Sequence, residues 1–310
     1  MSKVKSTTEQ VNATEERDGK YDSRSATDEY TDQRKQQYEQ QQKLKLKLTK
    51  IKHKIAVISG KGGVGKSTVT VNLAVAFALH DHNGKVGILD ADIHGPCVPK
   101  MLGLKGQKLV GGPGGLLFPV TGRLGIKVAS MDFLLPTDEA PVIWRGPLKM
   151  RVLQQFLSDI AWGELDFLLI DLPPGTGDEP LSVVQLIPDM DGVIIVTMPS
   201  EVSEAVVKKS VMFARQVGVP VIGVIENMSG FVCPDCGAKI DIFKTGGGKR
   251  IADSMAISYL GSIPIDPKIC NDSDGGLAFI AENKTSPATK AFAEIVKKIE
   301  HFLENTKTAS

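Results

Sequence analysis

The feature that most constrains this chain is the segment Gly60–Thr68, which reads GKGGVGKST. It follows a short apolar run at 55–59 and precedes residues 66–80, which have the composition of a helix. A strand, a glycine-rich turn and a helix in this order direct several backbone N–H groups toward one point. Because glycine has no Cβ, those groups can approach an anion closely, and the helix N-terminus adds a partial positive charge. The segment therefore predicts a phosphate-binding loop in an α/β fold.

Each residue of this loop has an expected part in binding. We expect Lys66 to reach the β- and γ-phosphates of a nucleotide, and the Ser67 hydroxyl to be a ligand of Mg²⁺. The other loop residues are expected to surround the phosphates: Gly60, Lys61, Gly62, Gly63, Val64, Gly65 and Thr68. A glycine-rich turn without a ligand is the simpler alternative, and the strand–loop–helix context argues against it.

Beyond this loop, short apolar runs alternate with helical segments. The runs predict buried strands at 55–59, 85–90, 125–131, 166–171, 192–198, 220–226 and 259–265. Helices are predicted near 66–80, 147–161, 203–217, 246–256 and 286–304. Strands that alternate with crossover helices favour a doubly wound, mainly parallel sheet of about seven or eight strands flanked by helices. Ligands of such sheets bind beyond the carboxyl ends of the strands.

The first 50 residues differ from the rest of the chain. They are rich in charged residues, Gln, Ser and Thr and contain few aliphatic residues. Such a segment cannot bury enough apolar surface to offset its loss of entropy on ordering. We expect a disordered polar tail at 1–50, with a transient helix in Asp32–Lys50 and a docking arm as the functional alternative. Residues 51–310 are expected to form the folded domain.

Composition excludes several classes of protein. The 37 basic and 36 acidic residues give a net charge of +1, which disfavours a nucleic-acid binder. No apolar run is long enough for a transmembrane helix, and the N-terminus lacks the apolar region of a secretory signal. Four cysteines in 310 residues do not form a disulfide framework. We therefore expect a cytoplasmic protein with reduced thiols and no stable membrane association.

Polar residues lie at the ends of three of the other predicted strands. Asp90 ends the second and Asp92 follows it, Asp171 ends the fourth, and Asn227 follows the sixth. An aspartate at the end of an apolar strand beside a phosphate loop typically holds Mg²⁺, so we assign that part to Asp171. Asp90 is expected to support the water shell of the metal. The alternative for Asp90 and Asp92 is that both are ordinary turn residues at the end of a strand. The Asn227 amide can donate to and accept from adenine.

A cysteine pair, Cys233-Pro-Asp-Cys236, lies after the sixth strand. Two thiolates at this spacing can bind one metal centre, but a tetrahedral Zn²⁺ or a [4Fe–4S] cluster needs four ligands. The sequence has no second C-x-x-C, whereas a two-fold homodimer would supply the missing pair. A bridging [4Fe–4S] cluster, a structural zinc ion and a redox dithiol all remain open from the spacing.

Several motifs together resemble a known family. The second lysine of GKGGVGKST, Lys61, makes this loop similar to the deviant Walker A loop of SIMIBI nucleotide-binding proteins, which include MinD and ParA. Further motifs are DADIHGP, the WRGP segment Trp144–Pro147, DLPPGTGD and ENMSGFVCPDCG. With them, the chain from about residue 52 to 300 resembles the Mrp/ApbC-type ATP-binding iron–sulfur carriers. The tail lacks the four-cysteine site found in some eukaryotic relatives.

The resemblance implies roles for single residues. Lys61 would reach across a homodimer to the partner's nucleotide, Asp92 would position or deprotonate the attacking water, and Gly175 would offer its N–H to the γ-phosphate.

The resemblance also indicates which nucleotide base is bound. It favours ATP over GTP, with Asn227 in contact with the adenine and the segment containing Pro264 and Asp266 beside the purine.

The implied function is that of a homodimeric ATPase. It would hold a [4Fe–4S] cluster between two chains at Cys233 and Cys236 and transfer it to apoproteins, with cluster donors as further partners. Two alternatives stay open: a MinD/ParA-like positioning ATPase, and a targeting ATPase whose dimer is clamped by zinc.

Overall fold

The computed structural model describes residues 38–39, 42–134, 146–187, 189–233 and 236–308. The chain divides after Glu39, and the account below concerns the unit Gln40–Ser310. Most of the expected tail lies outside the described residues, as do Trp144 and Arg145 of the WRGP motif and the two residues between the paired cysteines.

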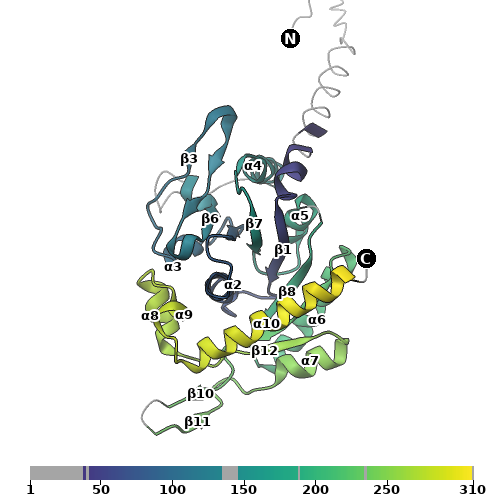
Figure 1. Cartoon of the computed structure of the whole chain (residues 1–310). Coiled ribbons are helices and arrows are strands. Elements are labelled where there is room, and N and C mark those ends of the chain that lie inside the picture. Colours follow the sequence, from purple (N-terminus) through teal and green to yellow (C-terminus); the bar gives the residue numbers. More distant parts are fainter. Residues whose placement is uncertain (1–37, 40–41, 135–145, 188, 234–235, 309–310) are drawn as a thin grey trace, which may run out of the picture. The chain divides into compact units, whose positions relative to one another are not determined.

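An eight-stranded sheet runs through this unit in the order β12-β9-β8-β1-β7-β2-β6-β5 (Figure 1). Its strands are β1 Ile51–Ile58, β2 Val86–Asp90, β5 Val120–Thr121, β6 Lys127–Ser130, β7 Leu165–Asp171, β8 Gly192–Thr197, β9 Val221–Glu226 and β12 Tyr259–Ser262. Neighbouring strands are parallel except for the edge pair β5 and β6. The predicted mainly parallel sheet is confirmed.

Helices cover both faces of the sheet. Along β1, Ile55 and Val57 belong to one buried apolar cluster and Ala56 and Ile58 to the other, as alternation in a strand requires. The first cluster includes residues of α2 Lys66–Leu79, α3 Val98–Met101, α9 Phe279–Glu282 and α10 Pro287–Thr308. The second includes residues of α4 Gly146–Asp159, α5 Asp178–Leu186, α6 Glu201–Gln216 and α7 Gly247–Met255.

The shorter elements lie in the connections. They are the hairpins β3 Val110–Gly111 with β4 Leu117–Phe118 and β10 Phe231–Val232 with β11 Lys239–Ile240, the helix α8 Pro267–Asp274, and 3₁₀ turns at Pro113–Gly115, Arg123–Gly125 and Met131–Leu134. The sequence analysis missed α3, α5, α8 and α9, of which α3 and α9 have only four residues each and are too short to show a helical period. In the described part of the chain, no helix combines the length and apolarity needed to cross a lipid bilayer.

Packing begins before residue 51, where we placed the end of the tail. Residues 42–48 are helical, and Leu44 and Leu48 are only 2% and 3% exposed in the second cluster. A transient helix was expected in Asp32–Lys50, but its packing was not, because leucines alternate with lysines here and show no apolar helix face. Leu46 is 68% exposed. Residues four apart share a helix face, whereas residues two apart do not, so the helix buries one pair and exposes the leucine between them.

A histidine–carboxylate pair joins two central strands at their amino ends. His53 Nδ1 in β1 lies 3.1 Å from Asp191 Oδ1, just before β8, and the backbone N–H of Lys54 donates to Asp191 Oδ2 at 2.8 Å. The His53 ring stacks on Phe167 with centroids 5.3 Å apart. Burial by itself raises the pKa of Asp191, but the hydrogen bonds from His53 and Lys54 outweigh it and hold the pKa below the ordinary 3.8.

We expect Asp191→Asn to lower the free energy of unfolding by about 1–2 kcal/mol at pH 5, because the hydrogen bonds to a charged acceptor are weakened. The folded pKa is depressed, so this contribution is present above the unfolded pKa of about 3.9 and is lost as the pH falls through the folded value. Urea unfolding at pH 5 and pH 2 measures the difference. The exposed Asp253→Asn is the control, and an equal loss of stability for Asp191→Asn at both pH values contradicts the prediction.

Candidate functional site

The loop between β1 and α2 depends on glycine at two positions. Gly63 and Gly65 both have φ near +78°, in the left-handed region. A Cβ at Gly65 would lie 2.2 Å from the Nδ2 atom of Asn227, and a Cβ at Gly60 would lie 2.2 Å from Val206 Cγ1. The loop is therefore folded tightly against α6 and the end of β9, and its backbone turns directly into the first turn of α2.

A buried ion pair lies under this loop. Lys66 Nζ is 2.8 Å from Asp171 Oδ1 at the end of β7, and the two side chains are 6% and 0% exposed. Ser67 Oγ donates to Asp171 Oδ2 at 2.5 Å, and Thr70 Oγ1 donates to Asp171 Oδ1 at 2.8 Å. The structure thus brings together the three side chains that we expected to hold phosphate and Mg²⁺.

Asp90 lies beside this group. It is the register partner of Asp171 across β2 and β7 and accepts hydrogen bonds from Ser130 Oγ at 3.2 Å and from the Val98 N–H at 3.3 Å. Burial raises the pKa of Asp90 well above 3.8, and the negative charge of Asp171 raises it further. The two buried carboxyl groups, Asp90 and Asp171, have only one lysine, Lys66, beside them to balance their negative charge. The carboxylate and hydroxyl oxygens are ligands that suit Mg²⁺, so the residues fit that ion.

The loop after β2 is ordered by Asp92. Its Oδ1 atom accepts backbone N–H groups from His94 at 3.2 Å and Gly95 at 3.1 Å, and the residue is half-buried. His94 Nε2 lies 3.3 Å from Glu179 Oε1 in α5. The two segments that follow β2 and β7 are therefore in contact, which the sequence did not reveal.

Gly175 differs from its expected arrangement. Its φ of +99° is in the region that favours glycine, but its N–H donates to the Ser59 carbonyl at 2.8 Å. In this structure the donor expected to face the γ-phosphate is bonded to the residue after β1. Lys61 is half-buried in the loop, and its carbonyl accepts a hydrogen bond from Ser59 Oγ. The contact expected of Lys61 involves a second chain and stays a prediction.

Asn227 supports the phosphate loop. Its side chain is buried, and Nδ2 donates to the Val64 carbonyl at 2.9 Å. The backbone N–H of Asn227 donates to the Thr197 carbonyl at 2.8 Å. The amide nitrogen that we expected to face adenine is therefore bonded to the loop.

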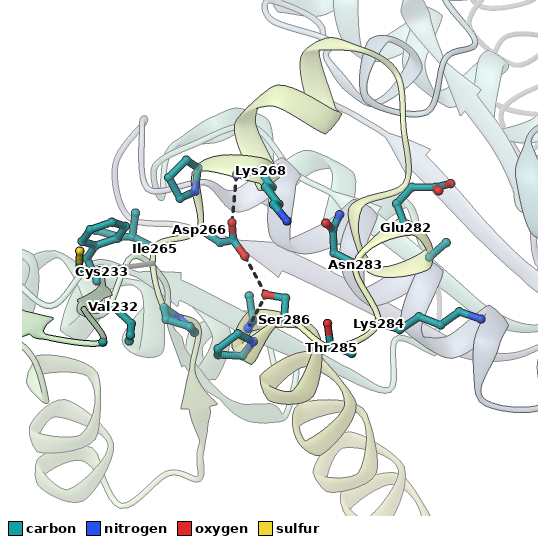
Figure 2. Close-up of a pocket in the computed structure, with 17 residues that line it drawn as sticks. Val232, Cys233, Ile265, Asp266, Lys268, Glu282, Asn283, Lys284, Thr285 and Ser286 are labelled. Atoms are coloured by element: carbon teal, nitrogen blue, oxygen red, sulfur yellow. Dashed lines mark hydrogen bonds between the residues drawn. The ribbon is translucent and has the colours of Figure 1, made fainter. Parts of the chain in front are cut away.

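Pro264 and Asp266 line a cavity of about 950 Å³ next to Cys233 (Figure 2). Asp266 also caps α8, because its Oδ1 accepts from the Lys268 N–H at 3.0 Å and its Oδ2 accepts from Ser286 Oγ at 2.7 Å. The segment expected beside the purine and the cysteine hairpin thus border one cavity.

The paired cysteines lie on the hairpin β10–β11, which extends away from the sheet (Figure 1). Cys233 is half-buried and Cys236 is exposed, and neither forms a disulfide. The Gly237 N–H donates to the Cys233 carbonyl, and the Cys233 N–H donates to the Ala238 carbonyl, both at 2.9 Å. Among the residues that the structure describes, no group of three or more His, Cys, Asp or Glu side chains could hold a metal ion. A thiolate metal centre at this hairpin therefore needs ligands from elsewhere.

Two further residues lie near these sites. Cys97, which lies outside the C-x-x-C pair, is beside Ser67 of the phosphate loop: burial raises its pKa, and a hydrogen bond with Ser67 opposes the effect. Glu226 is fully buried at the end of β9 and accepts a hydrogen bond from the Gly246 N–H at 2.9 Å. A carboxylate that ends the apolar strand VIGVIE is the signal that could have identified Glu226.

A glycine-rich phosphate loop between the first strand and helix of a parallel sheet, with Lys66, Ser67 and Asp171 in contact, defines a P-loop NTPase. Residues 50–300 match the profile of a family within the ParA group, described as NUBPL iron-transfer P-loop NTPase. The chain belongs to this family.

Related proteins are similar in sequence to this chain over most of its length. It is 53% identical over 251 residues to the iron-sulfur cluster carrier protein of Methanocaldococcus jannaschii, covering 81% of this chain and 85% of that protein. It is 46% identical over 293 residues to the iron-sulfur cluster carrier protein of Methanococcus maripaludis, covering 94% and 99% of the two chains.

Solved structures are similar as well. A nucleotide-binding protein of Archaeoglobus fulgidus, solved in complex with ADP, is 43% identical with a TM-score of 0.69, covering 80% of this chain and 94% of that one. MinD of Pyrococcus horikoshii, complexed with Mg-ADP, has a TM-score of 0.60 at 22% identity, covering 80% of this chain and 95% of that one, which shows the shared fold alone.

We expect Gly65→Ala to destabilise the nucleotide-free protein by about 1–3 kcal/mol, because an alanine there is strained at positive φ and displaces the Asn227 amide. Gly62→Ala is the matched control in the same loop, since a Cβ there meets no atom within 4 Å. The control should change stability by no more than about 0.5 kcal/mol. Urea unfolding without nucleotide compares the two variants, and equal effects would contradict the assigned loop geometry.

Proposed function

We propose that this protein is an ATPase that binds a [4Fe–4S] cluster between two copies of the chain and passes it to apoproteins. One observation carries the proposal: the same chain contains a phosphate loop, which lies over the Lys66–Asp171 ion pair, and a hairpin that carries two free thiols. The names of the similar carrier proteins support the same function. Apo iron–sulfur proteins and cluster donors are the expected partners, in the cytoplasm and without nucleic acid or a membrane.

The nucleotide would lie along the loop Gly60–Thr68. Lys66 would exchange Asp171 for the β- and γ-phosphates, and Ser67 and Asp171 would hold Mg²⁺, directly or through water, with Asp90 supporting its water shell. The bound ion would neutralise charge on the phosphates. Asp92 would orient the attacking water or accept its proton.

Two contacts would change with the nucleotide state. The Gly175 N–H, now bonded to Ser59, would turn to the γ-phosphate. Lys61 of each chain would reach the nucleotide of the other and stabilise the negative charge that develops during phosphoryl transfer.

The base would be read beside Asn227, Pro264 and Asp266. One N–H of the Asn227 amide is bonded to Val64, and its amide oxygen could accept a hydrogen bond from the adenine amino group. This favours ATP, whose base carries a donor at that position.

The hairpin would supply the cluster ligands. Cys233 and Cys236 of two chains give the four thiolates that a [4Fe–4S] cluster requires, and a two-fold axis brings them together. Thiolates bind zinc equally readily, so a zinc-clamped dimer is the alternative that metal analysis would separate.

Lys66→Ala should reduce ADP binding and ATP turnover together by tenfold or more, on the order of the loss of a charged contact to phosphate. Lys61→Ala should retain ADP affinity within about threefold and lose most of its turnover, because its contact forms in the dimer. Calorimetry with Mg-ADP and phosphate release from ATP give the two readouts. Unchanged turnover in Lys66→Ala would remove the ATPase assignment.

Anaerobic reconstitution should load about two iron and two sulfide ions per chain, as one [4Fe–4S] cluster in a dimer requires. Cys233→Ser with Cys236→Ser should load neither. The matched control, Cys97→Ser with Cys270→Ser, keeps the number of substitutions and should load fully. Iron, sulfide and zinc analysis with a mass measurement in solution checks this. Full loading of the Cys233→Ser, Cys236→Ser variant would contradict the cluster proposal. Stoichiometric zinc without iron would favour the zinc-clamped dimer.

A MinD/ParA-like positioning ATPase predicts a different result. It would sediment with liposomes or DNA in an ATP-dependent manner, whereas the proposed carrier would stay in the supernatant with and without ATP.

A further inference from the structure

Glu226 holds both ends of the cysteine hairpin. It is the last residue of β9 and is fully buried. Its Oε1 atom accepts hydrogen bonds from Ser229 Oγ at 2.5 Å and from the Gly246 N–H at 2.9 Å, and its Oε2 atom accepts from the Gly248 N–H at 2.5 Å. Ser229 precedes the hairpin, and the two glycines follow it. One carboxylate therefore closes the base of the segment that carries both thiols.

The next residue contacts the phosphate loop. Asn227 donates to the Val64 carbonyl, and the space between its amide and Gly65 is too small for a Cβ. Met228, which follows, has φ of +57°, an uncommon conformation for a methionine. Consecutive residues of one strand end thus join two sites, and the backbone between them and the hairpin is constrained.

The hairpin beyond its base has few other supports. Residues 236–245 are all exposed, and β10 and β11 contribute only two paired residues each. Backbone hydrogen bonds from Ser229 to Ile263 and from Ile265 to Gly230 hold the base against the segment that also borders the cavity in Figure 2. The position of the thiols therefore depends on the base, where Glu226 is buried.

We propose that Glu226 is a positioning residue that couples the phosphate loop to the cysteine hairpin. A nucleotide that moves the Val64 carbonyl moves Asn227, and the buried carboxylate beside it passes the displacement to both ends of the hairpin. The coupling rests on the proposed nucleotide site and adds a route by which nucleotide occupancy changes the exposure of the thiols. Such coupling requires contacts that differ between the two states, and the Asn227–Val64 contact is the one that a loop movement alters.

The test measures thiol reactivity in the full-length, reduced protein, freed of iron and zinc. N-ethylmaleimide labelling of Cys233 and Cys236 is followed peptide by peptide with mass spectrometry, with and without saturating Mg-ADP. In the wild type, ADP should change the labelling rate by about fivefold or more, the low end of typical coupling between sites. In Glu226→Gln the amide retains the volume but places an N–H₂ group against one of the donors. The response to ADP should fall below about twofold while ADP affinity stays within about threefold.

Two further variants keep the test specific. Glu204→Gln makes the same substitution on α6, where Glu204 pairs with Arg250 of α7 at 3.2 Å and touches neither hairpin end. It should keep the full response. Ser229→Ala removes only the hydrogen bond from Ser229 to Glu226 at the start of the hairpin. It should reduce the effect of ADP on the labelling rate by about half or more, and it replaces Glu226→Gln in the test if that variant does not fold.

The outcomes separate the two proposals. A full ADP response in Glu226→Gln or, if that variant does not fold, in Ser229→Ala overturns the coupling, as does an equal loss in Glu204→Gln. A wild type that binds ADP without any change in labelling overturns the coupling and leaves the nucleotide site intact. A wild type that binds no ADP overturns the proposed function and the coupling with it.

Discussion

The Lys66–Asp171 ion pair is the contact on which the arrangement of the site depends. Both charges are almost fully buried, and burying a charge without a partner is costly, so each holds the other in place. Removing one partner of such a pair typically costs about 3–5 kcal/mol. Ser67 and Thr70 donate to the same carboxylate, which joins the first turn of α2 to the end of β7. The phosphate loop is therefore held in place before any ligand arrives.

The parallel sheet explains why so many polar groups meet at one edge. All the strands that contribute to the site run in one direction, so Asp90, Asp171 and Glu226 end β2, β7 and β9 at the same side of the sheet. Each carboxylate is buried and accepts a hydrogen bond from a loop or from the start of a helix. In the proposed function, Lys66, Ser67 and Asp171 would exchange these internal partners for a nucleotide and a cation, and such an exchange would allow ligand binding to move the loops.

The cysteine hairpin and the phosphate loop share a support. Asn227 bonds to the loop, Glu226 bonds to both hairpin ends, and the two residues are adjacent in the chain. In the proposed mechanism, this shared support would link the thiols to the nucleotide site. The hairpin, whose base is bonded to Glu226 and whose residues 236–245 are exposed, would suit the proposed cluster site, which must accept and release a bound group.

The sequence by itself determined the features that depend on local chemistry. GKGGVGKST predicted the phosphate loop, apolar runs predicted seven strands of the sheet, and the C-x-x-C spacing identified the thiol pair, because each signal lies within a few neighbouring residues. Tertiary structure alone decided which distant groups meet. Asn227 is hydrogen-bonded to the Val64 carbonyl, Gly175 is hydrogen-bonded to the Ser59 carbonyl, and Leu44 is buried in the core. Such contacts depend on how segments far apart in the chain pack, and no local pattern encodes that choice.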